Sequence, residues 1–188
     1  MFSLLYGLWE YMSRKEEYRI LILGIDKAGK TTLLEKIKSL YTDLPGLEPE
    51  SILPTVGLNV GRLEAHNAQL IFWDLGGQPG LRSIWDKYYA DSHAILFVID
   101  AAAPARFDEA KDALESILGH RELFGAPLLV FANKQDSPQG LLRWQKEVKD
   151  TAILRRLRST SQRLRLNCQF ATLAPPAGLA LQLSSVAT

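Results

Sequence analysis

Two glycines, a lysine and two threonines stand where a strand-like segment gives way to a helix-like one. The stretch GIDKAGKTT at 24–32 follows the apolar run YRILIL and precedes a helical pattern at 30–40. This spacing matches the phosphate-binding loop, in which glycines let backbone N–H groups converge on an anion and the following helix adds its positive end. An incidental glycine-bearing turn is the alternative. The candidate nucleotide-binding residues of the loop are Gly24, Asp26, Lys27, Ala28, Gly29, Lys30, Thr31 and Thr32.

Lys30 is predicted to reach the β and γ phosphates of a nucleotide, and the Thr31 hydroxyl to ligate Mg²⁺. The apolar run PLLVFA is followed by Asn133, Lys134 and Asp136, which are predicted to determine which nucleotide base is bound. An aspartate carboxylate can accept both N1–H and the exocyclic amine of guanine, whereas adenine has no proton on N1. The Lys134 stem can cover a face of the ring, and Asn133 can tie this segment to the loop. The pattern therefore favours GTP over ATP, and a solvated polar turn or an ATP-dependent phosphotransferase are the alternatives.

Two further stretches, PTVGLNV and WDLGGQ, carry groups suited to a triphosphate. Asp74 is predicted to bind Mg²⁺ through a water, and Thr55 to complete the metal's ligands with its hydroxyl. Gly77 offers an N–H to the γ-phosphate, and Gln78 is the candidate catalytic residue that orients the attacking water. Because hydrolysis removes the γ-phosphate, the segments around Thr55 and Gly77 are candidate switches.

The elements that position these residues alternate along the chain. Strand-like runs lie at 18–23, 57–63, 68–73, 94–99 and 127–132, and helical patterns at 30–40, 79–90, 105–118 and 141–157. This order predicts an α/β fold with a mostly parallel sheet covered on both faces, whose ligands bind at the carboxyl ends of the strands.

Composition limits the function classes. The 188 residues are 47% hydrophobic and 23% charged, which is enough for a core in one domain. A net charge of +1 gives no global attraction to nucleic acid, and no nucleic-acid partner is expected. The single cysteine, Cys168, cannot form an internal disulfide, so a cytoplasmic location is expected. No stretch has the character of a transmembrane helix.

The motifs GIDKAGKTT, PTVGLNV, WDLGGQ and NKQD resemble those of the small GTPases of the ADP-ribosylation factor (Arf) family, and the match is good over 1–136 and poor afterwards. The resemblance implies a P-loop fold with a six-stranded sheet, GTP or GDP with Mg²⁺, and GTP hydrolysis that is slow without an activating protein. It also implies a nucleotide-exchange factor and effectors that read the surface of Leu58, Trp73 and Tyr88, for which plain core packing is the alternative. Several stretches resemble a branch that acts in trafficking at Golgi and trans-Golgi membranes.

Residues 1–17 are predicted to form an amphipathic helix, because Phe2, Leu5, Trp9 and Met12 recur at helical spacing. Packing on the domain's own core is one interpretation. The resemblance favours the other, in which residues 2–13 bind a membrane surface in the GTP state.

Three features suggest departures from an efficient hydrolase. The Asp26 carboxylate is expected to crowd and repel charge near the γ-phosphate, Pro79 restricts Gln78 to extended conformations, and no switch arginine is obviously placed to stabilise the transition state. An activating protein is therefore expected to supply one. A nucleotide-binding scaffold with negligible turnover is the competing hypothesis.

The C-terminal part fits the family least well. After a GTPase domain at 18–172, residues 173–188 form an uncharged tail expected to be disordered, and the usual closing strand and helix are predicted to be degraded. Ala171 is the sole candidate for the alanine whose N–H contacts the guanine oxygen.

Overall fold

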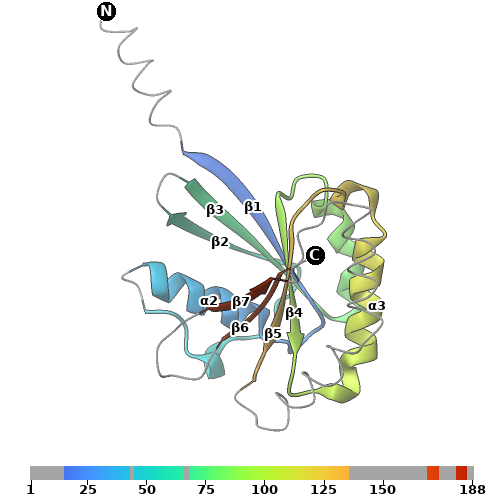
Figure 1. Cartoon of the computed structure of the whole chain (residues 1–188). Coiled ribbons are helices and arrows are strands. Elements are labelled where there is room, and N and C mark those ends of the chain that lie inside the picture. The colour runs from blue at the N-terminus through green and yellow to red at the C-terminus, as the bar shows by residue number, and fades with distance from the viewer. Residues whose placement is uncertain (1–14, 43–44, 66–67, 136–168, 174–180, 186–188) are drawn as a thin grey trace, which may run out of the picture.

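The computed structural model describes residues 15–42, 45–65, 68–135, 169–173 and 181–185. Its centre is one sheet of seven strands in the order β2-β3-β1-β4-β5-β6-β7 (Figure 1). Strands β3, β1, β4, β5 and β6 run parallel, while β2 and β7 pair antiparallel at the two edges. The predicted α/β class with a mostly parallel sheet is confirmed.

The strands follow the apolar runs of the sequence. Leu21, Ile22 and Leu23 of β1 are fully buried, because helices cover both faces of the sheet. The strand bounds are β1 Glu16–Leu23, β2 Leu58–Ala65, β3 Ala68–Leu75, β4 Ala94–Asp100, β5 Leu128–Asn133, β6 Gln169–Leu173 and β7 Leu181–Ser185.

Two α-helices lie on opposite faces of this sheet, α2 (Lys30–Tyr41) and α3 (Phe107–Leu118) (Figure 1). The helix predicted at 79–90 is instead a 3-10 helix, η2 (Pro79–Tyr88), which buries Trp85. Three short 3-10 turns, η1, η3 and η4, occupy Pro49–Ser51, Pro104–Arg106 and Arg121–Leu123. The helix predicted at 141–157 and most of the N-terminal segment 1–17 lie outside the described residues.

The sheet has one strand more than the six expected. β6 pairs parallel with β5, and β7 then returns antiparallel along β6, so part of the tail expected to be disordered extends the sheet. An exposed sheet edge is a template for a further strand, which explains how an uncharged segment with Leu181 and Leu183 can add to it. This is a correction to the predicted strand count, within the predicted class.

The parallel strands bring distant motifs to one edge. β1, β3 and β5 end at Leu23, Leu75 and Asn133, so the loop at 24–29, the WDLGGQ stretch and the start of NKQD meet at the carboxyl side. Among the described residues, no helix is long and apolar enough to cross a membrane.

The turn after β1 requires glycine at position 24. Its φ is 138°, and a Cβ there would lie 2.2 Å from the carbonyl oxygen of Val98 in β4. We therefore expect Gly24→Ala to destabilise the fold by at least about 2 kcal/mol, since it adds backbone strain to a steric overlap. Thermal melting at saturating GDP measures the effect. Gly80→Ala is the control, because a Cβ at Gly80 meets nothing within 4 Å; equal melting temperatures for the two variants would contradict the assignment.

Candidate functional site

The loop between β1 and α2 presents its N–H groups to a ligand because its carbonyls are already engaged. Every carbonyl from residue 24 to 28 accepts a hydrogen bond from a side chain, at 2.8 to 2.9 Å. Lys30 holds the first two, and three residues from other parts of the chain hold the rest. Within the described part of the chain no side chain caps the start of α2, and its first turn has no acidic residue. An anion is therefore the natural partner of its free N–H groups.

Lys30 is the buried cation of the site, with only 6% of its surface exposed. Its Nζ donates to the carbonyls of Gly24 and Ile25, both at 2.9 Å. An ammonium has three N–H donors, so one is left for a ligand. Burial lowers the pKa of Lys30 to about 8, while the charges of Asp74 and Asp26 oppose that shift. The negative charge of a bound phosphate would raise this pKa again and so stabilise the charged form.

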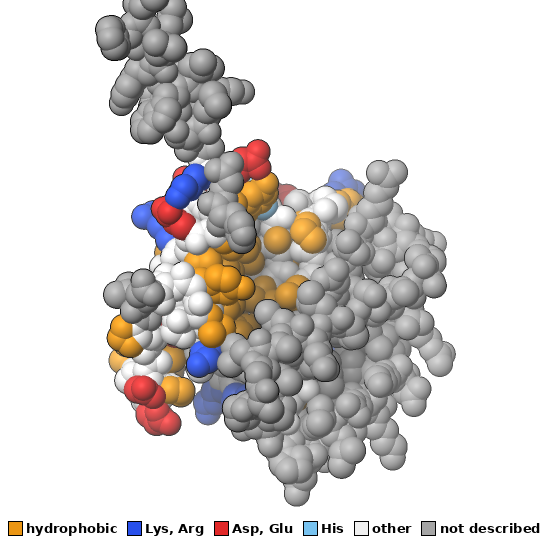
Figure 2. Space-filling model, turned by 60° about the vertical axis from the view of Figure 1, so that its left-hand side comes forward, with side chains coloured by type: hydrophobic (Ala, Val, Ile, Leu, Met, Phe, Trp, Pro, Cys, Tyr) orange, Lys and Arg blue, Asp and Glu red, His pale blue; other side chains and the backbone are white. Residues whose placement is uncertain are grey.

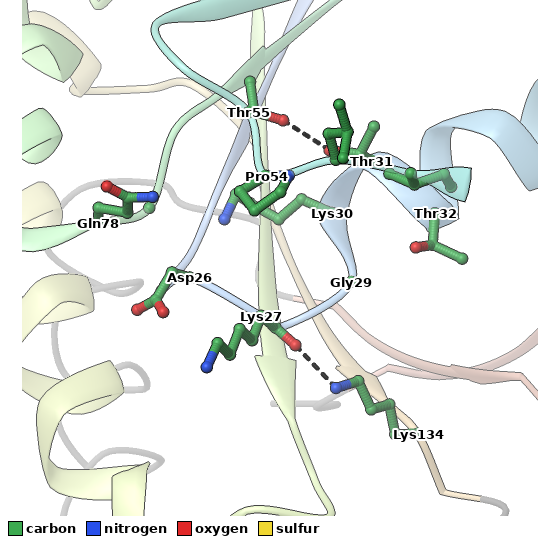
Figure 3. A pocket seen from close by; sticks show the side chains of 13 residues that line it. Asp26, Lys27, Gly29, Lys30, Thr31, Thr32, Pro54, Thr55, Gln78 and Lys134 are labelled. Atoms are coloured by element: carbon green, nitrogen blue, oxygen red, sulfur yellow. Dashed lines mark hydrogen bonds between the residues drawn. The ribbon is translucent and has the colours of Figure 1, made fainter. Parts of the chain in front are cut away.

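Three oxygen-bearing side chains from three segments converge beside Lys30. The Thr31 hydroxyl donates to Asp74 Oδ2 at 2.6 Å and lies 2.8 Å from the Thr55 hydroxyl (Figure 3). Asp74 is fully buried, and burial raises the pKa of its carboxyl against the opposing effects of Thr31 and Lys30. Asn59 faces Asp74 across the β2–β3 ladder and stabilises the carboxylate. The other oxygen of this carboxylate, Asp74 Oδ1, nevertheless lacks a well-formed hydrogen bond within the described residues.

This oxygen cluster fits a hard divalent cation such as Mg²⁺. Two hydroxyls and a buried carboxylate oxygen that has no partner among the described residues are oxygen ligands of the kind that Mg²⁺ takes alongside waters and phosphates. No cluster of three or more His, Cys, Asp or Glu capable of holding a metal occurs within the described ranges.

Asn133 and Lys134, the first two residues of NKQD, form hydrogen bonds with the phosphate-binding loop. Asn133 Nδ2 donates to the carbonyl of Ala28 at 2.8 Å, which confirms that Asn133 ties this segment to the loop. A Cβ at Gly29 would lie 2.3 Å from that amide nitrogen, so the close approach needs glycine. Lys134 donates to the carbonyl of Lys27 and to Asp100, both at 2.8 Å, and lines the same pocket (Figure 3).

The two other predicted base contacts are Asp136 and Ala171. Asp136 lies outside the described residues. Ala171 lies within β6, with Phe131 and Leu183 as its strand neighbours, rather than in a loop beyond the strand. This placement corrects the prediction for Ala171, because its backbone belongs to the sheet ladder and not to the carboxyl edge where the nucleotide loop lies.

Gly77 and Gln78 line the pocket, and the Gln78 side chain lies on the side opposite Thr32 (Figure 3). Gly77 is packed on the loop so closely that a Cβ would lie 2.3 Å from the carbonyl oxygen of Gly24. Gln78 is exposed and has φ −62° and ψ 144°, the extended conformation predicted from the following Pro79.

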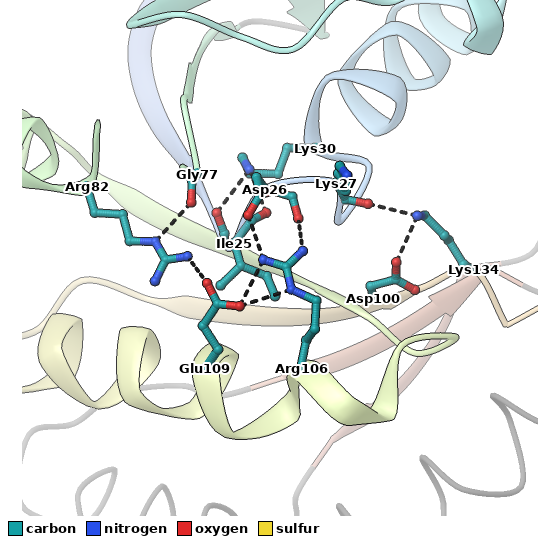
Figure 4. Close-up of polar contacts among 11 residues, drawn as sticks. Ile25, Asp26, Lys27, Lys30, Gly77, Arg82, Asp100, Arg106, Glu109 and Lys134 are labelled. Atoms are coloured by element: carbon teal, nitrogen blue, oxygen red, sulfur yellow. Dashed lines mark hydrogen bonds and ion pairs between the residues drawn. The ribbon is translucent and has the colours of Figure 1, made fainter. Parts of the chain in front are cut away.

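The expectation that Asp26 repels the γ-phosphate needs correction. Its carboxylate forms an ion pair with Arg106, Nη2 to Oδ1 at 2.6 Å, and the Arg106 Nη1 also donates to the Asp26 carbonyl (Figure 4). Although partial burial opposes it, Arg106 holds the pKa of the Asp26 carboxyl below its ordinary value. Its negative charge is therefore largely compensated. Nothing in the sequence pointed to Arg106, which is 80 positions away from Asp26.

Comparisons with known proteins identify the family that this chain resembles. The model of the ADP-ribosylation factor family matches residues 5–175. ADP-ribosylation factor-related protein 1 of Rattus norvegicus is 50% identical over 137 residues, which cover 72% of this chain and 68% of the relative. ADP-ribosylation factor-like protein 3 of Saccharomyces cerevisiae is 46% identical over 137 residues, 72% of this chain and 69% of the relative.

Among solved structures, the Arl6 BBS3 small GTPase from Trypanosoma brucei, with bound nucleotide analogue GppNp, is similar at a TM-score of 0.54. The match covers 79% of this chain and 99% of that one at 23% sequence identity, and so supports the fold alone. The family resemblance of the motifs is confirmed by the family model and the sequence relatives.

The lowered pKa of Lys30 predicts a pH dependence of nucleotide binding. Below about pH 8 the ammonium is already protonated, and above it phosphate binding must take up a proton. We expect the affinity for GDP to fall by up to about tenfold between pH 8 and pH 9. Lys30→Arg should bind less well at every pH but lose this slope, because a guanidinium stays protonated. A slope retained in Lys30→Arg would show that another group titrates.

Proposed function

The chain belongs to the ADP-ribosylation factor family, and we propose that this small GTPase uses Mg²⁺ and its two switch segments to recruit effectors in Golgi-associated membrane trafficking. As a family member it is a GTP-binding switch and a GTP hydrolase. The observation that carries the proposal is the convergence of Thr31, Thr55 and Asp74 beside the buried Lys30. Each comes from a different segment, so a ligand that binds all of them can control the conformation of the chain.

Mg²⁺ would be held by the hydroxyls of Thr31 and Thr55, with Asp74 bound through a water. When bound, the ion neutralises charge on the β and γ phosphates. The protein's own part is to keep Asp74 ionised, which the Thr31 hydrogen bond and the Lys30 charge both favour.

The switch rests on Thr55 and Gly77. Thr55 precedes β2 and Gly77 follows β3, and because Leu58 pairs with Leu75, both residues lie at the one end of this antiparallel pair that reaches the phosphate loop. The carbonyl of Gly57 also accepts a hydrogen bond from the N–H of Gly76 at 2.9 Å. Loss of the γ-phosphate would release Thr55 and Gly77 together, and the β2–β3 pair could then move as one unit.

Leu58, Trp73 and Tyr88 are the proposed effector surface. All three are half-buried hydrophobic residues packed against the core, and the Trp73 and Tyr88 rings meet edge to face at 5.5 Å. Figure 2 turns the β2–β3 side toward the viewer, and hydrophobic side chains gather there between charged ones. Leu58 lies in β2, Trp73 in β3 and Tyr88 in η2. Because β2 begins and β3 ends beside the nucleotide pocket, the shape of this surface would depend on the bound nucleotide.

Membrane attachment is proposed for residues 2–13, whose apolar face is broad. Attachment would be weak and would depend on a helper at the Golgi or trans-Golgi membrane. Between membrane encounters the protein would be cytoplasmic, with an exchange factor and an activating protein setting its nucleotide state.

Thr31→Asn tests the Mg²⁺ assignment. The substitution removes a hydroxyl ligand and its hydrogen bond to Asp74, so GTP binding in Mg²⁺ should weaken at least about tenfold, while GDP binding in EDTA should change little. Equilibrium titration with a fluorescent nucleotide gives both affinities. Thr32→Ser is a matched control, since Thr32 lines the same pocket without joining the oxygen cluster. An unchanged affinity for GTP in Thr31→Asn would refute the assignment.

Gln78→Leu tests hydrolysis. Leucine cannot orient a water, so this variant should bind GTP normally and lose the acceleration by an activating protein, an effect on the order of 10³-fold or more. Single-turnover hydrolysis of loaded GTP, with and without Golgi extract, is the measurement. If the parent chain also shows no turnover with extract, the scaffold hypothesis is favoured.

The same variant tests the cellular proposal. Tagged Gln78→Leu should accumulate on Golgi membranes, and Phe2→Ala combined with Trp9→Ala should return it to the soluble fraction. A membrane fraction unchanged by the double substitution would argue that residues 2–13 pack on the domain instead.

A further inference from the structure

A series of ion pairs leads from Asp26 of the phosphate loop to the switch segment around Gly77. Asp26 binds Arg106, Arg106 binds Glu109 of α3, and Glu109 binds Arg82 of η2 (Figure 4). Arg82 completes the series by donating from Nε to the carbonyl of Gly77 at 2.9 Å. Glu109, Arg82 and Arg106 do not line the pocket that holds Lys30 and Thr31.

Glu109 is the centre of this series because each of its oxygens serves a different arginine. Oε2 accepts from Arg106 Nε at 3.0 Å and lies 2.8 Å from Arg106 Nη2 in an ion pair, and Oε1 accepts from Arg82 Nη2. Arg82, with 21% of its side chain exposed, is the least exposed member. An isolated surface ion pair contributes little, but one carboxylate between two guanidiniums cannot be removed without leaving like charges close together.

The hydrogen bond from Arg82 to Gly77 connects these ion pairs to a residue of the proposed γ-phosphate site. That carbonyl belongs to the peptide between Gly77 and Gln78, so Arg82 sets the orientation of the peptide. On its other side Gly77 touches the loop backbone at Gly24 and Asp26. The position of Gly77 against the loop is therefore fixed from both sides, by packing and by a charge-assisted hydrogen bond.

We propose that Glu109 is a positioning residue for the triphosphate form, acting through Arg82 to hold the Gly77–Gln78 peptide over the phosphate loop. This inference rests on the proposed role of Gly77 at the γ-phosphate. Glu109 also pairs with Arg106, but the Asp26–Arg106 ion pair does not include Glu109, so the effect of Glu109 on Gly77 runs through Arg82. GDP has no γ-phosphate and does not need Gly77 in this place. The contribution of Glu109 thus belongs to GTP and not to GDP.

The test compares the affinities of the full chain for a non-hydrolysable GTP analogue and for GDP, both in Mg²⁺. Glu109→Gln keeps the size of the side chain but removes its charge, and we expect its preference for the analogue over GDP to fall on the order of tenfold. Asp108→Asn is the matched control. Asp108 is an exposed acid in the same first turn of α3. The Asp108→Asn variant therefore measures the effect of losing one negative charge at the start of the helix, without loss of the ion pairs. A preference in Glu109→Gln equal to that of the parent would overturn the proposal.

Arg82→Ala and the double variant separate positioning from general stability. If Glu109 acts through Arg82, adding Glu109→Gln to Arg82→Ala should lower the preference no further, whereas additive losses would overturn the proposal. GDP affinity near that of the parent verifies that each variant folds, and Arg82→Ala alone carries the test should Glu109→Gln not fold. A parent chain that binds no GTP analogue would refute the proposed function, which is a different outcome.

Discussion

Five consecutive carbonyls, from Gly24 to Ala28, are held by side chains, and the rest of the nucleotide site depends on this constraint. A loop whose carbonyls are engaged on one side has its N–H groups left for an anion on the other. The four side chains that do this are Lys30, Arg106, Lys134 and Asn133. They come from α2, the turn before α3, and the end of β5, so the sheet must form before the loop can take its shape.

The buried charges of Lys30 and Asp74 favour the binding of a ligand of opposite charge to each. Lys30 is buried beside Asp74, and burial disfavours the charged forms of both side chains. A phosphate next to Lys30 and a cation next to Asp74 would relieve both costs at once. The site can therefore hold nucleotide and metal tightly while remaining sensitive to the loss of one phosphate, which is what a switch requires.

Motifs set by local spacing were predictable from sequence, and contacts between distant segments were not. The loop at 24–32, the strands and the Asn133 contact could be predicted, because each is marked by particular residue types at a characteristic spacing. Arg106 and Glu109 belong to no motif, and their contact with Asp26 and Arg82 arises only because the turn before α3 passes the loop. The strand β7 was missed because the lack of charged residues and the two preceding prolines argued only against a helix, while its pairing partner β6 lies outside any motif.

The central claim is that a triphosphate draws the segments around Thr55 and Gly77 onto the loop. Hydrogen–deuterium exchange of the full chain, loaded in turn with GDP and with a non-hydrolysable GTP analogue in Mg²⁺, tests it most directly. The account predicts that backbone amides at 52–57 and 76–82 exchange more slowly with the analogue, while those of β4 and α3 change little. Equal exchange of both segments in the two forms would contradict it.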